Sequence, residues 1–170
     1  MNMKTIVLIG MMGAGKSQTG KNLASKISCK YFDLDKTIEL KENMTISDIF
    51  ARYGEKYFRT CEYKTLKQIF EAEDMVISLG GGTFENDEIR NLVLKSANVV
   101  YLETSASIIY ERIKNDTSRP LLKNNMTIEA IEKLINIRKN NYKLAPYTIL
   151  TDNITIEDVT SEIMKCVGLK

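Results

Sequence analysis

The chain has 170 residues, of which 44% are hydrophobic and 27% charged; this is typical of one globular domain and argues against a disordered chain. The formal net charge of +2 is too small to indicate binding to nucleic acid or to an acidic membrane. Histidine is absent, which excludes His-based triads and His-ligated metal sites. Any reaction must therefore use acids, lysine, arginine, backbone amides or a metal ion.

The cysteines and the first apolar stretch bear on the cellular location. Cys29, Cys61 and Cys166 are scattered and lack Cys-x-x-Cys spacing, which is typical of reduced thiols rather than of disulfides or a zinc site. The first apolar stretch is far shorter than the roughly 20 residues of a transmembrane helix, and glycines follow it in place of a cleavage site. We therefore expect a cytoplasmic protein with neither nucleic-acid nor membrane partners.

The first predicted element is a strand that runs into a glycine-rich loop. Residues 5–9 are a β-branched apolar run of strand length, and residues 18–27 have a helical pattern. Residues 10–17 between them fill the pattern Gly-x-x-x-x-Gly-Lys-Ser, in the strand-loop-helix context that this motif requires. The alternative, a glycine-rich turn with a solvated lysine, does not account for so many matching positions.

The residue types of this loop suit phosphate binding. Glycines let backbone N–H groups approach a polyphosphate, and the following helix directs its positive end to the same place. Lys16 would reach the β- and γ-phosphates, and the hydroxyl of Ser17 would be a ligand of Mg²⁺. We therefore predict that the loop binds ATP or GTP.

Two acids follow the loop and its helix. Residues 30–35, Lys-Tyr-Phe-Asp-Leu-Asp, are interpreted as a second strand with Asp33 and Asp35 at its carboxyl end. Ligands bind at that end of an open α/β sheet, and residues two apart on a strand share a face, so both carboxylates should point toward the phosphate loop. The alternative is a surface turn whose acids begin the next helix.

Residues 36–73 have a helical pattern that is longer than a crossover connection requires. Gly54 and the capping-like pair Thr45 and Asp48 divide it into several helices. Such an insertion at the ligand-facing edge predicts a helical subdomain for a second substrate. Within it Arg59 stands beside two aromatic residues, and the alternative to a binding role is a solvated arginine on a helix.

The third predicted strand, residues 75–79, runs into Gly80, Gly81 and Gly82. Glycines there let a ligand approach bare backbone, although a flexible turn into a helix at residues 86–94 is the alternative. P-loop ATPases and GTPases more often have an acid after this strand to hold Mg²⁺. Since none is present, Asp33 is the candidate for that role.

A fourth strand over residues 98–102 and a helix over residues 105–114 lead into a polar segment. The segment contains a proline and a central arginine, Arg119, which predicts a mobile lid over about residues 114–125 that closes this arginine on the phosphates. Arg112, on the helix before it, is expected near the same mouth.

The last predicted elements are a helix over residues 127–142, a strand over residues 146–150 and a helix over residues 155–167. Arg138 lies near the end of the first helix, where the helix dipole alone would favour an arginine. Strands and helices alternate throughout, which predicts an α/β fold with a parallel sheet between two layers of helices. We expect one domain over residues 1–170.

Together these motifs resemble the shikimate kinase family over essentially the whole chain. The resemblance implies a three-layer P-loop fold related to nucleoside monophosphate kinases, with five parallel strands in the order 2-3-1-4-5. It implies a monomeric enzyme that uses ATP and Mg²⁺ to phosphorylate the 3-hydroxyl of shikimate, in chorismate and aromatic amino-acid biosynthesis. The segments that carry it are residues 10–17, 32–35, 58–62, 78–82 and 119–122.

For the acceptor, the resemblance implies a role for each motif residue. Asp35 would hold two shikimate hydroxyls close to the reacting one. Arg59 and Arg138 would clamp the shikimate carboxylate. The backbone that helps them would be that of Gly80, Gly81 and Gly82.

For the donor, the resemblance implies that Arg119 acts on the transferring phosphate and that Arg112 packs on adenine. Asp33 would reach Mg²⁺ through water, beside Ser17. The catalytic residues would be Lys16, Asp35 and Arg119. The nucleotide-binding residues would be Gly13, Ala14, Gly15, Lys16, Ser17, Gln18, Arg112 and Arg119.

The chain departs from the family at one place. The family usually has Arg-x-Pro-x-Tyr where residues 138–142 read Arg-Lys-Asn-Asn-Tyr. The arginine and tyrosine keep their spacing, but without the proline the helix is free to run on and to place the Arg138 guanidinium elsewhere.

Two other functions share the phosphate loop. One is a related small kinase that acts on gluconate or on a nucleoside monophosphate. The other is a nucleotide-dependent switch module, against which the chain has neither an Asn-Lys-x-Asp segment that reads guanine nor an acid after the third strand.

Overall fold

The computed structural model describes residues 5–72, 74–114 and 127–169. In these residues a five-stranded parallel sheet has the order β2-β3-β1-β4-β5, which confirms the predicted order. The strands are β1 (Ile6–Ile9), β2 (Lys30–Asp33), β3 (Met75–Ser78), β4 (Asn98–Glu103) and β5 (Tyr147–Leu150).

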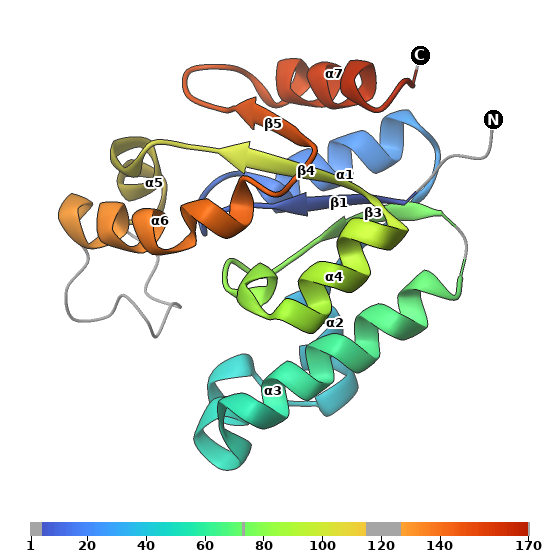
Figure 1. Ribbon diagram of the computed structural model, residues 1–170, viewed down its shortest axis with the longest axis vertical. Coiled ribbons are helices and arrows are strands. Elements are labelled where there is room, and N and C mark those ends of the chain that lie inside the picture. Colours follow the sequence, from blue (N-terminus) through green and yellow to red (C-terminus); the bar gives the residue numbers. More distant parts are fainter. Residues whose placement is uncertain (1–4, 73, 115–126, 170) are drawn as a thin grey trace.

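Helices cover both faces of this sheet, with α1 and α7 on one side and α2, α3 and α4 on the other (Figure 1). Their bounds are α1 (Lys16–Lys26), α2 (Leu34–Glu42), α3 (Ile46–Phe70), α4 (Asp87–Ser96), α5 (Ala106–Ile113), α6 (Ile128–Tyr142) and α7 (Ile156–Cys166), with a short 3-10 helix η1 (Thr83–Glu85). The predicted α/β architecture is therefore confirmed.

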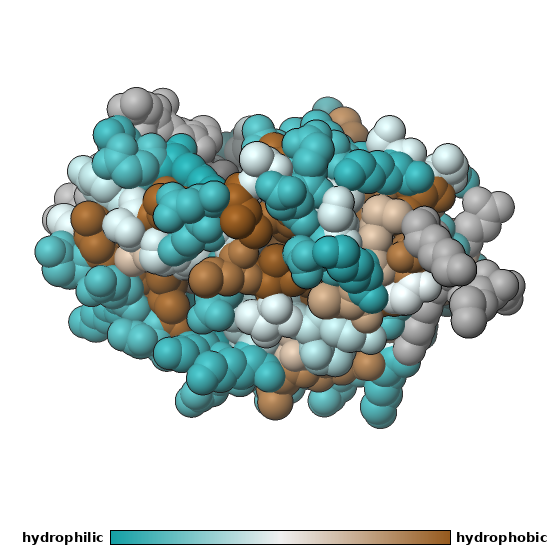
Figure 2. Space-filling view, turned by 90° about the horizontal axis from the view of Figure 1, so that it is seen from above, coloured by the Kyte–Doolittle hydropathy of each residue, from teal (hydrophilic) through white to brown (hydrophobic). Residues whose placement is uncertain are grey.

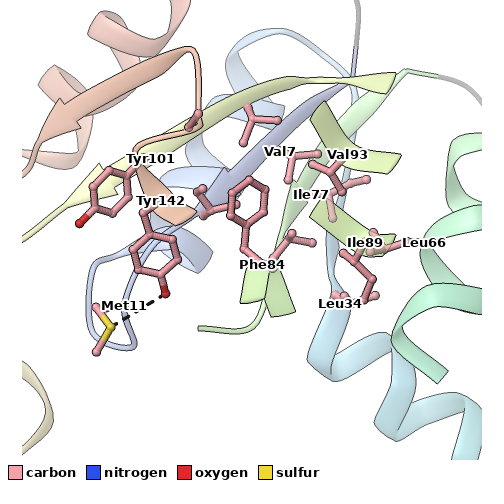
Figure 3. Close-up of a cluster of buried hydrophobic side chains, with 14 of the residues drawn as sticks. Val7, Met11, Leu34, Leu66, Ile77, Phe84, Ile89, Val93, Tyr101 and Tyr142 are labelled. Carbon is pink, nitrogen blue, oxygen red and sulfur yellow. Dashed lines mark hydrogen bonds between the residues drawn. The ribbon is translucent and has the colours of Figure 1, made fainter. Parts of the chain in front are cut away.

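Alternating residues of the strands build two separate hydrophobic clusters. Val7 and Ile9 of β1 belong to the larger cluster, which also takes residues from α3, α4 and α6, and which Figure 3 shows in close-up. Ile6 and Leu8 belong to a second cluster, which is completed by α1 and α7. Because successive strand residues point to opposite faces, the sheet is buried on both sides.

The register of the strands brings their carboxyl ends to one edge. Asp33 at the end of β2 is paired with Ser78 at the end of β3, and Leu8 of β1 is paired with the same Ser78. Three segments consequently begin side by side at the edge where ligands bind in open α/β sheets. They are the glycine-rich loop of residues 10–17 after β1, called the P-loop from here on, the acids after β2 and the glycines after β3.

The P-loop has the left-handed backbone that its glycines allow. Gly13 has φ +77°, and a Cβ atom there would lie 2.8 Å from Cγ2 of Ile113. Gly15 has φ +89° and precedes the first residue of α1. A side chain at Gly13 would therefore be strained and would collide with α5.

The structure corrects the predicted end of the second strand. β2 ends at Asp33, which is the N-cap of α2 and accepts a hydrogen bond from the backbone N–H of Lys36 at 3.3 Å. Asp35 lies in the first turn of α2, so the expectation that both acids share one face of a strand is wrong. The reason is that an aspartate which satisfies free N–H groups at a helix start favours an early start of the helix.

The helical region after β2 has the predicted division. Asn43 ends α2 in the left-handed region, and Thr45 caps α3 by accepting a hydrogen bond from the N–H of Asp48. Gly54 interrupts α3 with φ 77° and ψ 174°, which divides it into two helical segments. The sequence did not predict η1, which directly follows the three glycines.

One part of the predicted site is not described by the structure. Arg119 and nearly all of the predicted lid lie outside the described residues.

Among the helices of the described segments, none is both long and apolar enough to cross a membrane. On the side of α7 and β5 the surface shows hydrophobic side chains among mostly hydrophilic ones (Figure 2).

Candidate active site

A cavity of about 840 Å³ lies at the carboxyl edge of the sheet. It brings together residues from four loops that are far apart in the sequence. The predicted site residues that line it are Gly13, Ala14, Gly15, Lys16, Ser17, Gln18, Asp33, Asp35, Gly80, Gly81 and Arg112. The lining also includes Thr151, Ile154, Thr155 and Ile156 from the segment between β5 and α7, which sequence analysis did not identify.

Two basic side chains donate hydrogen bonds to carbonyl oxygens of the P-loop. Lys16 donates hydrogen bonds from Nζ to the carbonyl oxygens of Gly10 and Met11, each at 2.9 Å. Arg112 donates from Nη1 to the carbonyl oxygen of Gly13 at 3.1 Å. Both predicted basic residues therefore contact the loop, and Arg112 does so from α5.

Ser17 and Asp33 form an oxygen-rich pair at the start of α1. The hydroxyl of Ser17 donates to Oδ2 of Asp33 at 2.9 Å, and the hydroxyl of Tyr31 lies 3.4 Å from the same oxygen. Burial raises the pKa of Tyr31, so its phenol remains a donor at neutral pH. Hydroxyl and carboxylate oxygens are the ligands that Mg²⁺ prefers, directly or through water.

The described segments contain no cluster of three or more acidic or cysteine side chains that could hold a metal ion by itself. Mg²⁺ commonly binds through one or two protein oxygens together with substrate phosphates and water. The pair of Ser17 and Asp33 fits such a site. Tyr31 supports this pair and was not predicted, since an aromatic residue in a strand carries no specific signal.

Asp35 is held in a poorly solvated position next to other acids. Burial raises its pKa from 3.8 to about 6, the carboxylates of Glu62 and Asp33 add to this rise, and Lys16 opposes it. A Cβ atom on Gly80 would lie 2.6 Å from Oδ1 of Asp35. The carboxylate therefore packs against bare backbone, and only glycine leaves room for it.

Arg59 is paired with two acids of its own helix. Its Nη1 contacts Oε2 of Glu62 at 2.7 Å, and its Nη2 contacts Oε1 of Glu55 at 3.0 Å. Glu62 is fully buried and also accepts a hydrogen bond from Thr83. Burial raises the pKa of Glu62, while Arg59 and Thr83 lower it.

Glu62 was part of the motif at residues 58–62 but was not selected as a site residue. Its spacing of three residues from Arg59 on a helix was the available signal, because such residues are neighbours on the helix surface. Its bond to Thr83 could not be found in this way, since η1 was not predicted.

Arg138 is a buried cation, only 9% exposed. Its Nη1 donates to the carbonyl oxygen of Gly81 at 2.8 Å, and the hydroxyl of Tyr142 donates to the same oxygen. Within the segments that the structure describes, no carboxylate forms an ion pair with Arg138. A buried guanidinium without a counter-charge is costly, and it suits an anionic ligand.

The segment without the family proline is helical. The helix α6 continues to Tyr142, and a Cβ atom on Gly82 would lie 3.4 Å from Nη2 of Arg138 and 3.4 Å from Nη2 of Arg59. The two arginines are thus near each other and near the triple glycine.

Comparison with known proteins identifies the family of this chain. The family model for shikimate kinase matches residues 12–168. A shikimate kinase of Sulfurihydrogenibium sp. is 46% identical over 162 residues, which cover 95% of this chain and 96% of that protein. The chain belongs to the shikimate kinase family. The predicted family is therefore confirmed.

Solved structures extend the comparison to three dimensions. The shikimate kinase from Acinetobacter baumannii in complex with shikimate matches with a TM-score of 0.92 and 32% identity, over 98% of this chain and 93% of that one. A gluconokinase from Sinorhizobium meliloti matches with a TM-score of 0.59 and 14% identity, over 97% of this chain and 91% of that one. The second match shows a shared fold only.

Proposed function

We propose that the cavity, together with Arg59 and Arg138, binds both ATP and shikimate; the two arginines lie beside the triple glycine but are not among the residues that line the cavity. The γ-phosphate is transferred to the 3-hydroxyl of shikimate, which gives shikimate 3-phosphate and ADP. Membership of the shikimate kinase family makes the chain an ATP-using kinase that phosphorylates shikimate. The observation that carries the assignment of the acceptor subsite is the convergence of Arg59 and Arg138 at Gly82. Two forked guanidinium groups match a planar carboxylate.

On the acceptor side, Arg138 supplies the main charge for the carboxylate, because Glu55 and Glu62 already partly neutralise Arg59. The backbone of residues 80–82 lines the subsite. Asp35 accepts hydrogen bonds from the shikimate hydroxyls and orients the reacting one. Its raised pKa also makes it a suitable acceptor for the hydroxyl proton.

On the donor side, the N–H groups of residues 13–18 bind the phosphates, and Lys16 moves from the loop carbonyls to the β- and γ-phosphates. Arg112 covers the base together with residues 154–156, which also line the cavity. With Lys16 and Mg²⁺, Arg119 is the proposed third positive group around the transferring phosphate. Phosphoryl transfer depends mostly on such positioning and charge neutralisation.

Ser17 would hold Mg²⁺ directly and Asp33 would hold it through water. When bound there, the ion neutralises charge on the phosphate oxygens. A Ser17→Ala variant should lose most of the gain in ADP affinity that Mg²⁺ gives the wild type, measured by titration calorimetry with and without Mg²⁺. An unchanged gain would contradict this assignment.

The activity is tested with purified protein in a coupled ADP-release assay. We expect ADP formation that depends on both shikimate and Mg²⁺, and phosphorus NMR should identify the product as the 3-phosphate. Faster turnover of gluconate or of a nucleoside monophosphate would favour a related kinase, whereas acceptor-independent hydrolysis would favour a switch module.

A further proposal is that the active species is a monomer. Light scattering under turnover conditions tests it.

A further inference from the structure

The side chain of Met11, a residue of the P-loop, reaches the arginine proposed to bind the acceptor. Met11 is only 2% exposed. Its Sδ lies 3.7 Å from Nη1 of Arg138 and 3.9 Å from the hydroxyl of Tyr142, and Figure 3 shows the Tyr142 hydroxyl directed at the sulfur. Both donors also bind the carbonyl oxygen of Gly81, so three segments of the chain meet here.

The backbone of the same residue belongs to the donor site. The carbonyl oxygen of Met11 accepts a hydrogen bond from Lys16 at 2.9 Å. A Cβ atom on Gly81 would lie 3.3 Å from the backbone nitrogen of Met12 and 3.3 Å from Nη1 of Arg138, which shows how closely the loops pack. Met11 therefore contacts Lys16 of the proposed donor site with its backbone, and Arg138 of the proposed acceptor subsite with its side chain.

A thioether suits this position chemically. It is unbranched, polarisable and a weak acceptor, so it can orient the N–H groups of Arg138 without neutralising their charge. A carboxylate would compete with the substrate anion, as Glu62 partly does at Arg59. The free charge of Arg138 is thereby kept for a ligand.

The other donor to the sulfur is rigid. The ring of Tyr142 is fully buried and stacks on Tyr101 with ring centroids 4.9 Å apart. Its hydroxyl is fixed between Gly81 and Met11. Met11 consequently has a defined place between this phenol and the guanidinium of Arg138.

We propose that Met11 is a positioning residue for the acceptor, which holds Arg138 in the orientation that binds the shikimate carboxylate. This inference rests on the proposed role of Arg138. The location of Met11 suggests a different role, because a substitution in a phosphate-binding loop is ordinarily expected to weaken the binding of ATP.

The test compares Met11→Leu, which keeps the volume but removes the sulfur, with Met11→Ala, which removes most of the side chain. We expect the KM for shikimate to rise roughly threefold in the first variant and roughly tenfold in the second. The KM for ATP and kcat should change less than about twofold. Thermal unfolding checks that both variants fold, and Met164→Leu on α7 is a matched control with unchanged KM values.

A second measurement separates positioning from packing. In an Arg138→Lys background, Met11→Leu should have no further effect on the KM for shikimate, because the group that Met11 positions is gone. If Arg138→Lys alone leaves this KM unchanged, the proposed role of Arg138 fails and the inference with it. If Arg138→Lys raises it but neither Met11 variant does so, or both raise the KM for ATP equally, only the inference about Met11 is overturned.

Discussion

Arg59 and Arg138 approach the same backbone residue from two different helices. A methyl group on Gly82 would lie 3.4 Å from Nη2 of each. Arg59 on α3 is paired with acids, whereas Arg138 on α6 has no ion pair within the described segments. The charge of Arg138 is therefore not balanced by an ion pair there, and in the proposed complex the carboxylate of shikimate lies between the two guanidinium groups and supplies the negative charge.

Replacing Gly82 with alanine tests this arrangement directly. Gly82 has φ −105° and ψ −7°, which alanine adopts without strain, so the variant should unfold at the wild-type temperature. Its methyl group would occupy space between the guanidinium groups and raise the KM for shikimate by about tenfold, with little change for ATP. Steady-state kinetics with each substrate varied in turn provides the measurement. An equal rise in the KM values for shikimate and ATP would contradict the assignment of Gly82 to the acceptor subsite.

The two arginines should differ when each is replaced with alanine. Either change should weaken the binding of shikimate by about 2–5 kcal/mol, because an ion pair with the carboxylate is lost. The binding of ATP should change much less. Arg59→Ala should in addition lower the free energy of unfolding, since it leaves the buried Glu62 without its cation. Arg138→Ala leaves no acid unpaired and should not. Titration calorimetry and urea unfolding separate the two effects, and similar stability losses for both variants would contradict the assignment.

The pH dependence of the reaction should reflect Asp35. Its pKa is raised to about 6 by burial and by nearby acids, and the proposed role requires the carboxylate form. The value of kcat/KM for shikimate, which reports the enzyme before shikimate binds, should therefore fall as the pH drops below about 6. A profile that stays flat down to pH about 4.5 would show that Asp35 does not act in its charged form.

The same pKa makes Asp35 a cost to stability at neutral pH. Because the folded-state pKa of about 6 exceeds the ordinary 3.8, the folded protein binds more protons between these values, and stability is lost as the pH rises through this window. Asp35→Asn should therefore raise the free energy of unfolding by about 1–2 kcal/mol at neutral pH and by less at pH about 5. Urea unfolding at both pH values measures this. A destabilised variant at neutral pH would contradict the prediction.

Lys16→Ala should abolish phosphoryl transfer while the fold remains intact. The ammonium group donates hydrogen bonds to the carbonyl oxygens of Gly10 and Met11 in the loop, and its loss removes the positive charge proposed for the β- and γ-phosphates. Circular dichroism should be unchanged, and kcat should fall by at least about a hundredfold. A variant that fails to fold would show that Lys16 has a structural role in the loop.

The sequence predicted the parts of the site that depend on short, contiguous segments. The apolar run before the P-loop predicted its strand, the helical pattern after it predicted its helix, and the loop residues predicted phosphate binding. The alternation of elements predicted the sheet. The end of β2 was predicted wrongly, because strand propensity and helix capping compete at Asp33 and the cap prevailed. The position of Arg138 was uncertain for a similar reason, since the local pattern does not show where α6 packs.

The sequence by itself thus determined the parallel α/β fold and the glycine-rich loop, because each depends on neighbouring residues, and the order and spacing of its motifs indicated the family by resemblance. Only the tertiary structure decided how the acceptor subsite is built. Arg138 meets Gly81 across 57 positions, Thr83 meets Glu62 across 21, and Tyr142 meets Met11 across 131. Such contacts arise when buried helices pack on the sheet, and packing depends on the shape of the whole core rather than on any local segment.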